Sequence, residues 1–246
     1  MDIFTVAIQK GGTGKTTTAA AIAWAAAYRG RKVLAIDADP QGQLSFTLAA
    51  DTSKPGSYDL LEGAAAADLI QQTPAGIDVI PASWNLSTVT SGRGSARRLQ
   101  QALKPVKGKY DLIVIDTPPT AGELQYNALQ AATGLIIPLQ ADIYNLQSLY
   151  QITDTARQIQ GSNPDLKITG FVLTQYDGRS TIARQMKDTI TEQAAAMGVP
   201  YLGTIRGAVA VKEAAALQQS LFEYAPKSKP AQDYLALYET ITKQEG

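Results

Sequence analysis

The stretch "KGGTGKTTT" at residues 10–18 holds the residues of this chain that are best suited to phosphate chemistry. Its glycines let the backbone turn tightly and point N–H groups inward, toward a bound anion. Lys15 can then reach the β- and γ-phosphates of a nucleotide, and the hydroxyl of Thr16 can bind Mg²⁺. The strand-like run "IFTVAIQ" before it and the helical run "KTTTAAAIAWAAA" after it supply the strand–loop–helix context of a phosphate-binding loop.

Two positions depart from the standard loop. The usual pattern has a glycine where this chain has Gln9, and a second lysine, Lys10, stands at the front of the loop. A dinucleotide-binding motif is disfavoured because its last glycine would fall on Thr17. The residues predicted to bind the nucleotide phosphates are Lys10, Gly11, Gly12, Thr13, Gly14, Lys15, Thr16 and Thr17.

Carboxylates follow two of the predicted strands. "DLIVIDTPP" contains Asp116, and "VLAIDADPQGQ" contains Asp37 and Asp39. Because open parallel sheets bind ligands beyond the carboxyl ends of their strands, we expect these acids to converge with the loop. Asp116 is placed to hold the hydration shell of Mg²⁺, and Asp39 to orient an attacking water. We therefore assign Asp37 and Asp116 to the nucleotide site, and Thr16, Asp39 and Asp116 to the metal.

The composition narrows the chemistry further. The chain has 246 residues and contains neither cysteine nor histidine, which excludes disulfides, thiol nucleophiles, histidine bases and the usual zinc, copper and iron ligands. Any metal must be a hard cation held by oxygen atoms, such as Mg²⁺. Lysine plus arginine equals aspartate plus glutamate, at 22 each, so the whole-molecule charge favours neither nucleic acid nor acidic ligands.

Short apolar runs alternate with longer helical patterns along the chain. This order predicts an α/β fold, a doubly wound and mostly parallel sheet with helices on both faces. No internal repeat or long linker divides residues 1–246, so we expect a single domain. We expect surface loops with a short helix over residues 50–75, and a C-terminal helix with an apolar stripe of Leu235, Leu237 and Ile241. The predicted strands are "IFTVAI", "KVLAID", "IDVIPA", "DLIVID", "GLIIPL" and "KITGFVLT".

The N-terminus lacks the basic lead of a signal peptide. The longest stretch of small apolar residues, "AAAIAWAAA", is too short to cross a bilayer. We therefore expect a soluble, cytoplasmic protein without a stable membrane anchor.

Four segments together resemble one family. "KGGTGKTTT", "DADPQGQ", "DTPP" and "GFVLTQYDGRS" are similar to the ParA/Soj/MinD group of deviant-Walker P-loop ATPases, and most similar to its ParA branch. The similarity extends from Ile3 to about Tyr238, and the K-G-G-x-G-K-T form is much more specific than a generic phosphate loop. The resemblance implies an ATPase with ATP and Mg²⁺ as cofactors, which forms a nucleotide-sandwich homodimer.

The resemblance also implies roles for single residues. In the sandwich dimer the front lysine, here Lys10, crosses the interface and touches the phosphates bound to the other subunit. Lys15 and Thr16 bind phosphate and Mg²⁺, Asp39 supports the attack of water, and Asp116 is the Walker B acid. Hydrolysis is expected to be slow because no residue offers itself as a strong general base. Positioning and charge, supplied by Lys10, Lys15 and Asp39, must then carry the rate.

ParA proteins bind DNA without sequence preference as ATP dimers, and a ParB-type partner stimulates hydrolysis and release. By resemblance we expect binding to double-stranded DNA, association with the nucleoid when ATP is bound, and a plasmid or chromosomal locus as cargo. Because the net charge is zero, the DNA footprint must be a local patch that becomes continuous on dimerisation. The candidate DNA contacts are Arg179, Arg184, Lys187, Arg206, Lys212, Lys227 and Lys229.

The chain departs from the family pattern at several positions. "TIRGAV" stands where many relatives have an "I-P-R-N" turn, and Gln43 replaces the usual asparagine of a switch-like turn. These changes leave the expected ATP site intact, but Arg206 could face either the nucleotide base or DNA. Asp37 is expected to shape the site more than to react. The first strand starts within three residues, so we expect no N-terminal helix-turn-helix domain.

Three alternatives stay open. A MinD-like membrane-cycling ATPase would end in a basic amphipathic helix, whereas "LALYETITKQEG" has mixed charge. A metabolic P-loop enzyme is the second: an iron–sulfur reductase needs cysteines that this chain lacks, and a ligase needs substrate-specific residues that no motif identifies. The third keeps the ParA machinery but positions a protein assembly on the nucleoid.

Overall fold

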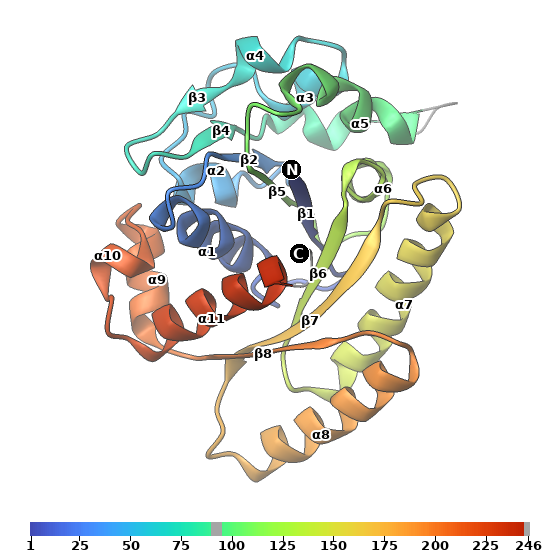
Figure 1. Ribbon diagram of the computed structural model, residues 1–246, viewed down its shortest axis with the longest axis vertical. Coiled ribbons are helices and arrows are strands. Elements are labelled where there is room, and N and C mark those ends of the chain that lie inside the picture. Colours follow the sequence, from blue (N-terminus) through green and yellow to red (C-terminus); the bar gives the residue numbers. More distant parts are fainter. Residues whose placement is uncertain (90–94, 244–246) are drawn as a thin grey trace.

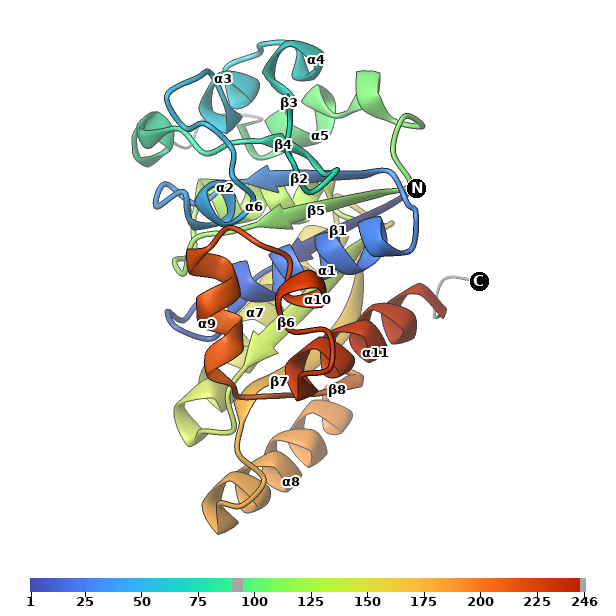
Figure 2. The ribbon, with the colours of Figure 1, turned by 90° about the vertical axis from the view of Figure 1, so that its left-hand side faces the viewer.

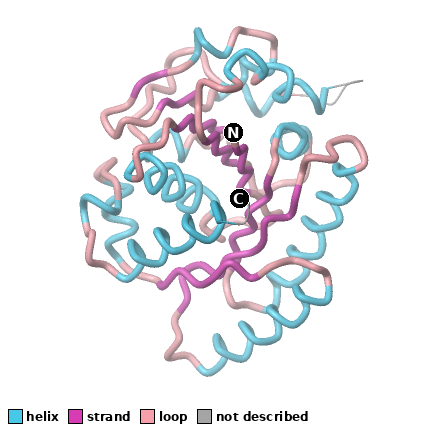
Figure 3. Tube along the Cα trace, in the orientation of Figure 1, coloured by secondary structure: helices cyan, strands magenta, loops and turns pink. Residues whose placement is uncertain are grey.

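An eight-stranded sheet runs through the computed structural model, which describes residues 1–89 and 95–243 (Figure 1). The strand order is β3-β4-β2-β5-β1-β6-β7-β8, and the neighbouring strands are parallel except for the antiparallel pair β3–β4 at one edge. Figure 3 shows the strands as a band with helices along both sides. The strands are β1 (Asp2–Val6), β2 (Val33–Asp37), β3 (Gln71–Gln72), β4 (Asp78–Ile80), β5 (Leu112–Asp116), β6 (Gly134–Leu139), β7 (Lys167–Tyr176) and β8 (Tyr201–Arg206).

Helices cover both faces of this sheet. Figure 1 shows α1, α9 and α11 on one side and α6, α7 and α8 on the other. The α-helices are α1 (Lys15–Tyr28), α2 (Gln43–Thr47), α3 (Ser57–Leu61), α4 (Ala66–Leu69), α5 (Arg98–Ala102), α6 (Glu123–Ala131), α7 (Ile143–Gln160), α8 (Thr181–Ala196), α9 (Val209–Ala216), α10 (Leu221–Tyr224) and α11 (Lys229–Lys243). The 3₁₀ turns are η1 (Trp84–Thr88), η2 (Ser95–Arg97) and η3 (Lys104–Val106). The predicted doubly wound α/β fold is confirmed.

Burial explains why the central strands read as unbroken apolar runs. Every residue of β2, β5 and β6 is buried, as expected for parallel strands that are covered on both faces. On one face the alanine-rich helix α1 is buried from Thr18 to Ala26 and packs against α11 and β5. Alanine side chains are small, so the backbone of α1 can lie close to the sheet.

The six predicted strands are all present, but two further strands were missed. The two-residue strand β3 is too short to carry a periodic signal. The edge strand β8 is only partly buried, so it lacks the continuous apolar run of the inner strands. The region 50–75 contains two short helices, α3 and α4, and β3, where loops with one short helix were expected.

The C-terminal helix forms as predicted and packs inward. In α11, Leu237 and Ile241 are buried, and Leu235 is partly buried against the same core. Tyr234 and Tyr238 of α11 join this apolar face, which contacts α1 and β8. Within residues 1–89 and 95–243, the helices lack the length and apolar character needed to cross a membrane.

Candidate active site

The phosphate loop lies between β1 and α1, at the edge of the sheet where the strands end. Figure 2 shows the arrows of β2 and β5 pointing toward this edge. Gly12 and Gly14 have φ angles of 75° and 86°, in the left-handed region that glycine adopts without strain. Gly14 occupies the N-cap position of α1 and has no side chain that could accept a hydrogen bond from the first N–H groups of the helix. The first N–H groups of α1 are thus available to a phosphate.

Side chains from two neighbouring strands hold the loop in place. The carbonyl oxygen of Gly12 accepts hydrogen bonds from Gln140 Nε2 at 3.0 Å and from Gln175 Nε2 at 3.1 Å. The carbonyl oxygen of Thr13 accepts one from Thr174 Oγ1 at 2.7 Å. These three side chains were not predicted from the sequence. They lie at the carboxyl ends of β6 and β7. The rule that open parallel sheets bind ligands beyond these ends, which predicted the acids, could have predicted these side chains too.

Lys15 lies in the centre of the site and is buried, with 7% of its surface exposed. Its Nζ donates a hydrogen bond to the carbonyl oxygen of Lys10 at 2.9 Å. Burial lowers the pKa of Lys15, and the carboxylates of Asp116 and Asp39 act in the opposite direction. A bound phosphate would add negative charge beside this buried ammonium and so favour its charged form.

Asp116 ends β5 and is completely buried. Its Oδ1 accepts a hydrogen bond from the Thr117 amide at 3.0 Å, whereas its buried Oδ2 has no hydrogen-bond partner in the described structure. Burial and the negative charge of Asp37 raise the pKa of Asp116 well above its usual value, while the Thr16 hydroxyl lowers it in part. An uncompensated carboxylate oxygen in this position needs a proton or a cation.

A hydrated Mg²⁺ ion fits this site. No cluster of three or more acidic residues able to cage a metal exists within the described part of the chain. Mg²⁺ usually keeps several waters and takes its remaining ligands from one or two protein oxygens and from phosphates. Thr16 and the unpartnered oxygen of Asp116 can supply this protein share. The ion would neutralise charge on the phosphates and orient them.

The two acids at and after the end of β2 have different roles. Asp37 lies in register with Asp116 on the neighbouring strand and is also completely buried. It accepts hydrogen bonds from the Asp39 amide at 3.1 Å and from the Ser45 amide and hydroxyl, both at 2.7 Å. Burial raises the pKa of Asp37 to about 6. Asp37 therefore fixes the turn that carries Asp39, and its direct contact with nucleotide stays a prediction.

Hydrogen bonds hold Asp39 within the turn after β2 and connect Asp37 to the segment that follows β4. Asp39 is 6% exposed, and its Oδ1 accepts a hydrogen bond from the Gln41 amide at 3.0 Å. The Ser45 hydroxyl, which donates to Asp37, accepts from the amide of Ala82 at 2.8 Å. Two residues beyond Ala82, the side chain of Trp84 is 81% exposed.

Lys10 takes a different partner from Lys15. Its Nζ lies 3.1 Å from Oδ2 of Asp142, which precedes α7, and 5.7 Å from the centre of the Tyr144 ring. The side chain of Lys10 is 29% exposed. Lys10 is therefore neither a freely solvated lysine nor a partner of the acids Asp37, Asp39 and Asp116. The loop holds two lysines, of which one is committed to the buried site and the other lies at its edge.

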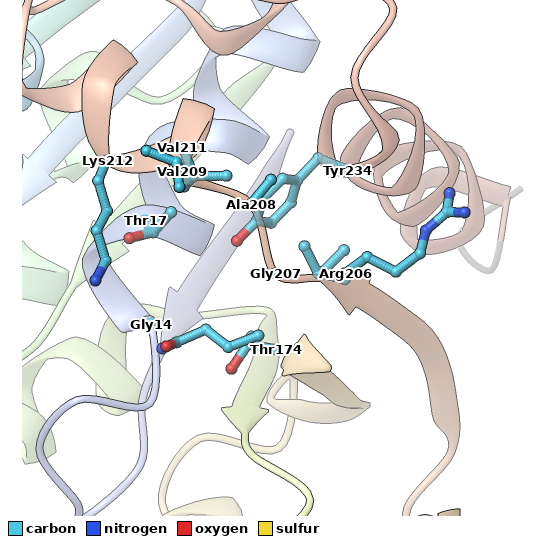
Figure 4. A pocket seen from close by; sticks show the side chains of 12 residues that line it. Gly14, Thr17, Thr174, Arg206, Gly207, Ala208, Val209, Val211, Lys212 and Tyr234 are labelled. Carbon is cyan, nitrogen blue, oxygen red and sulfur yellow. The ribbon is translucent and has the colours of Figure 1, made fainter. Parts of the chain in front are cut away.

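A pocket of about 460 Å³ opens beside the start of α1 (Figure 4). Gly14 and Thr17 line one side of it, and the segment 207–211 after β8 lines the other. Tyr234 of α11 reaches the same pocket, and burial raises the pKa of this tyrosine to about 12. The phenol thus stays protonated at neutral pH. The position next to the phosphate loop suits the nucleoside part of a nucleotide.

Comparison with known proteins agrees with this geometry. Residues 1–168 match the AAA domain family. The chain is 37% identical to the chromosome partitioning protein ParA of Caulobacter vibrioides, covering 99% of this chain and 94% of that protein. It is 34% identical to the sporulation initiation inhibitor protein Soj of Bacillus subtilis, covering 97% of each.

The chain belongs to the ParA/Soj family of P-loop ATPases. The predicted family, fold class and ATPase activity are thereby confirmed. A solved structure from Mycobacterium smegmatis, named as a cobyrinic acid a,c-diamide synthase with a bound ATP analogue and magnesium, is also similar. Its TM-score is 0.86 at 30% identity, covering 100% of this chain and 96% of that one. This ligand pair agrees with the cofactors predicted for the ParA/Soj-type loop.

The buried charge of Asp116 gives a stability prediction. We expect Asp116→Asn to raise the melting temperature of the nucleotide-free ATPase at pH 8 by about 2–4 °C, which corresponds to about 1 kcal/mol. The asparagine keeps the hydrogen bond from Thr117 but removes a buried negative charge. The same variant should lose the extra stability that Mg²⁺–ATP confers. Thermal denaturation with and without Mg²⁺–ATP measures both effects.

The size of this stabilisation depends on pH. The pKa of Asp116 is higher in the folded than in the unfolded chain, so the native state binds the proton more tightly. The gain from Asp116→Asn should therefore be largest above the folded-state pKa and vanish as the pH falls toward ordinary carboxyl values. Exposed Asp68 on α4 provides the control, because Asp68→Asn should leave the melting temperature unchanged both with and without Mg²⁺–ATP. A less stable nucleotide-free Asp116→Asn protein at pH 8 would contradict the assignment.

The residues predicted to contact DNA do not form one uniform set. The guanidinium of Arg206 pairs with Asp233 through Nε at 2.9 Å and NH2 at 2.6 Å, and Figure 4 shows it pointing away from the pocket. Arg179 pairs with Asp177 at 3.0 Å. In this structure Arg206 forms an ion pair with α11, and its contact with the nucleotide base or with DNA stays a prediction.

The other basic candidates form no ion pair among the described residues. Arg184 donates to the carbonyl oxygens of Gly178 and Arg179 at the start of α8. The Nζ of Lys187 lies over the rings of Tyr176 and Tyr201. The candidates that are exposed and have no ion pair among the described residues are Arg184, Lys212, Lys227 and Lys229. A ParA-type DNA contact through them stays a prediction.

Proposed function

We propose that this chain is an ATP-driven DNA partition protein. Two subunits enclose two Mg²⁺–ATP units face to face, the dimer binds double-stranded DNA without sequence preference, and hydrolysis releases it. A ParB-like partner stimulates the slow hydrolysis, and the cycle positions a plasmid or chromosomal locus over the nucleoid. Residues 1–246 act as one ATPase unit, which is supported by the eight strands that share one sheet.

The observation that carries this proposal is the placement of the two loop lysines. Lys15 is buried among the site's own acids, whereas Lys10 is solvent-accessible and its ammonium is held outside that group by Asp142. One nucleotide site does not need both. A triphosphate with Mg²⁺ keeps residual negative charge, and two such units facing each other repel. A lysine from each partner can neutralise this charge, which makes assembly depend on ATP.

The proposed DNA contact rests on exposed lysines near the carboxyl edge of the sheet. Lys212 lines the pocket beside the phosphate loop, Lys227 lies on the connection into α11, and Lys229 is the first residue of α11. Net charge is zero, so these lysines must act as a local patch. The relatives named as chromosome partitioning proteins support DNA as the partner.

A DNA-binding titration tests this function. We expect the chain to bind a non-specific duplex with Mg²⁺–ATP, but not with ADP or without nucleotide, and less tightly as salt rises. Replacing Lys212, Lys227 and Lys229 with glutamate should reduce the slope of log affinity against log salt by about 3 per subunit, or about 6 for the dimer, at about one for each phosphate contact. Fluorescence anisotropy at several salt concentrations gives both quantities.

The matched control uses lysines at the opposite edge. Lys104, Lys107 and Lys109 are exposed, and two of them lie beside Met1 at the start of β1. Their replacement with glutamate makes the same charge change and should leave the salt slope unaltered. DNA binding that is indifferent to nucleotide would contradict the partition cycle, although not the ATPase activity.

The same preparation separates the alternatives. A MinD-like protein would float with lipid vesicles when ATP is bound, but here the apolar face of α11 is packed against α1 and β8. A ligase, as the name of the Mycobacterium smegmatis structure suggests for that protein, would couple ATP turnover to a small-molecule acid instead of DNA. A ParA-type machine with a protein cargo would bind DNA normally, so its cargo has to be identified by pull-down.

A further inference from the structure

The contact between Lys10 and Asp142 joins residues that are 132 positions apart in the chain. The two oxygens of Asp142 have separate tasks. Oδ1 accepts a hydrogen bond from the Tyr144 amide at 2.8 Å and so caps α7, whereas Oδ2 lies 3.1 Å from the ammonium of Lys10. Although burial acts in the opposite direction, the bonds from Tyr144 and Lys10 hold the pKa of Asp142 below its usual value.

The carboxylate of this pair is the fixed member and the lysine is the movable one. Asp142 is tied to α7 by its cap and by the hydrogen bond from the Asn145 amide to its carbonyl oxygen at 3.0 Å. Gln140 on the same connection binds the carbonyl oxygen of Gly12, so this segment also holds the phosphate loop. Lys10 has a long flexible side chain that can swing while its backbone stays in the loop.

Binding of Lys10 to a phosphate and to Asp142 at the same time is electrostatically unfavourable. If the ammonium kept its partner while binding a phosphate, the carboxylate and the phosphate would lie within a few ångströms and repel. The pair is also weak enough to exchange, because the two side chains are 29% and 37% exposed. An ion pair of this exposure changes an equilibrium by up to about fivefold.

We propose that Asp142 is an intramolecular counter-ion that holds Lys10 in the separate subunit and releases it when the lysine binds the nucleotide of a second copy of this chain. The inference rests on the proposed sandwich dimer. It makes Asp142 a positioning residue that acts through Lys10 and raises the dissociation constant of the dimer. Two such pairs break for each dimer that forms.

The test is the dimer dissociation constant of the full chain with a non-hydrolysable ATP analogue and Mg²⁺, measured by sedimentation velocity. Asp142→Asn keeps a good helix cap but removes the charge that competes for Lys10. We expect this variant to dimerise about 2- to 25-fold more tightly than the wild type, since two pairs contribute up to about fivefold each. Asp142→Ser, which also caps helices, should behave alike and serves if the asparagine variant folds poorly.

Glu62→Gln provides the matched control. It removes a comparably exposed ion pair, Arg98 NH1 to Glu62 Oε1 at 2.8 Å, that lies away from the loop. This variant should dimerise as the wild type does. If the wild type dimerises but both Asp142 variants match it or dimerise more weakly, the counter-ion proposal is wrong and the sandwich dimer stands. If the wild type binds the analogue and stays monomeric, the proposed function fails and this inference with it.

Discussion

Replacing Asp39 with alanine is expected to lower the rate of ATP hydrolysis by at least about a hundredfold while ATP binding continues. Asp39 is 6% exposed and its Oδ1 is held by the Gln41 amide, so the carboxylate is oriented before substrate arrives. The chain offers no histidine as a base, and positioning of the attacking water must carry the rate. Phosphate release under saturating Mg²⁺–ATP measures the effect.

The ATP-bound dimer should persist in this variant, because the interactions that assemble it are separate from the hydrolysis step. Asp39→Asn is the informative control, since its amide oxygen can still accept the hydrogen bond from Gln41. A slow Asn variant would show that the negative charge matters and not the turn alone. Rapid phosphate release by Asp39→Ala would refute the role assigned to this residue.

The second large effect concerns Lys10. We expect Lys10→Ala to bind ATP with partly retained affinity but to weaken ATP-dependent dimerisation by at least about a hundredfold, and hydrolysis with it. Lys15 remains in place to bind the subunit's own phosphates. The loss falls on the interface because each dimer would face two uncompensated triphosphates. Isothermal titration measures nucleotide binding, and sedimentation velocity measures dimerisation.

Lys54→Ala is a suitable control for this experiment. Lys54 forms an exposed ion pair with Asp51 at 3.8 Å, in a loop outside the phosphate site. Its loss should change neither nucleotide binding nor assembly. A normal ATP-induced dimer from Lys10→Ala would remove the basis for the sandwich, and with it the explanation for the second lysine of the loop.

Much of the site could be predicted because its chemistry is local in sequence. The loop glycines, Lys15 and Thr16 stand within one motif, and Asp37 and Asp116 each end an unbroken apolar strand. Parallel strands bring such ends to one edge, so the convergence of the acids followed from the strand pattern. The buried strands themselves were predictable for the same reason, since burial on both faces leaves a continuous apolar run.

Contacts between distant segments could not be read in this way. Nothing near Lys10 in the sequence indicates Asp142, and nothing near Arg206 indicates Asp233. Such pairs depend on how α7 and α11 sit beside strand ends, which is a property of packing and not of local pattern. The partly exposed edge strand β8 escaped prediction for a related reason, because its pattern does not alternate cleanly between buried and exposed residues.

The hydrogen bonds from Asp37 through Ser45 to Ala82 place a fluorescent side chain, Trp84, close in sequence to the segment that is bonded to the turn after β2. The chain has two tryptophans, of which Trp24 is buried in the core and Trp84 stands almost fully in water just beyond Ala82. We therefore expect the fluorescence of Trp84 to be more sensitive to changes around this turn than that of buried Trp24. We expect nucleotide binding to change this emission, which can be measured on the unlabelled protein.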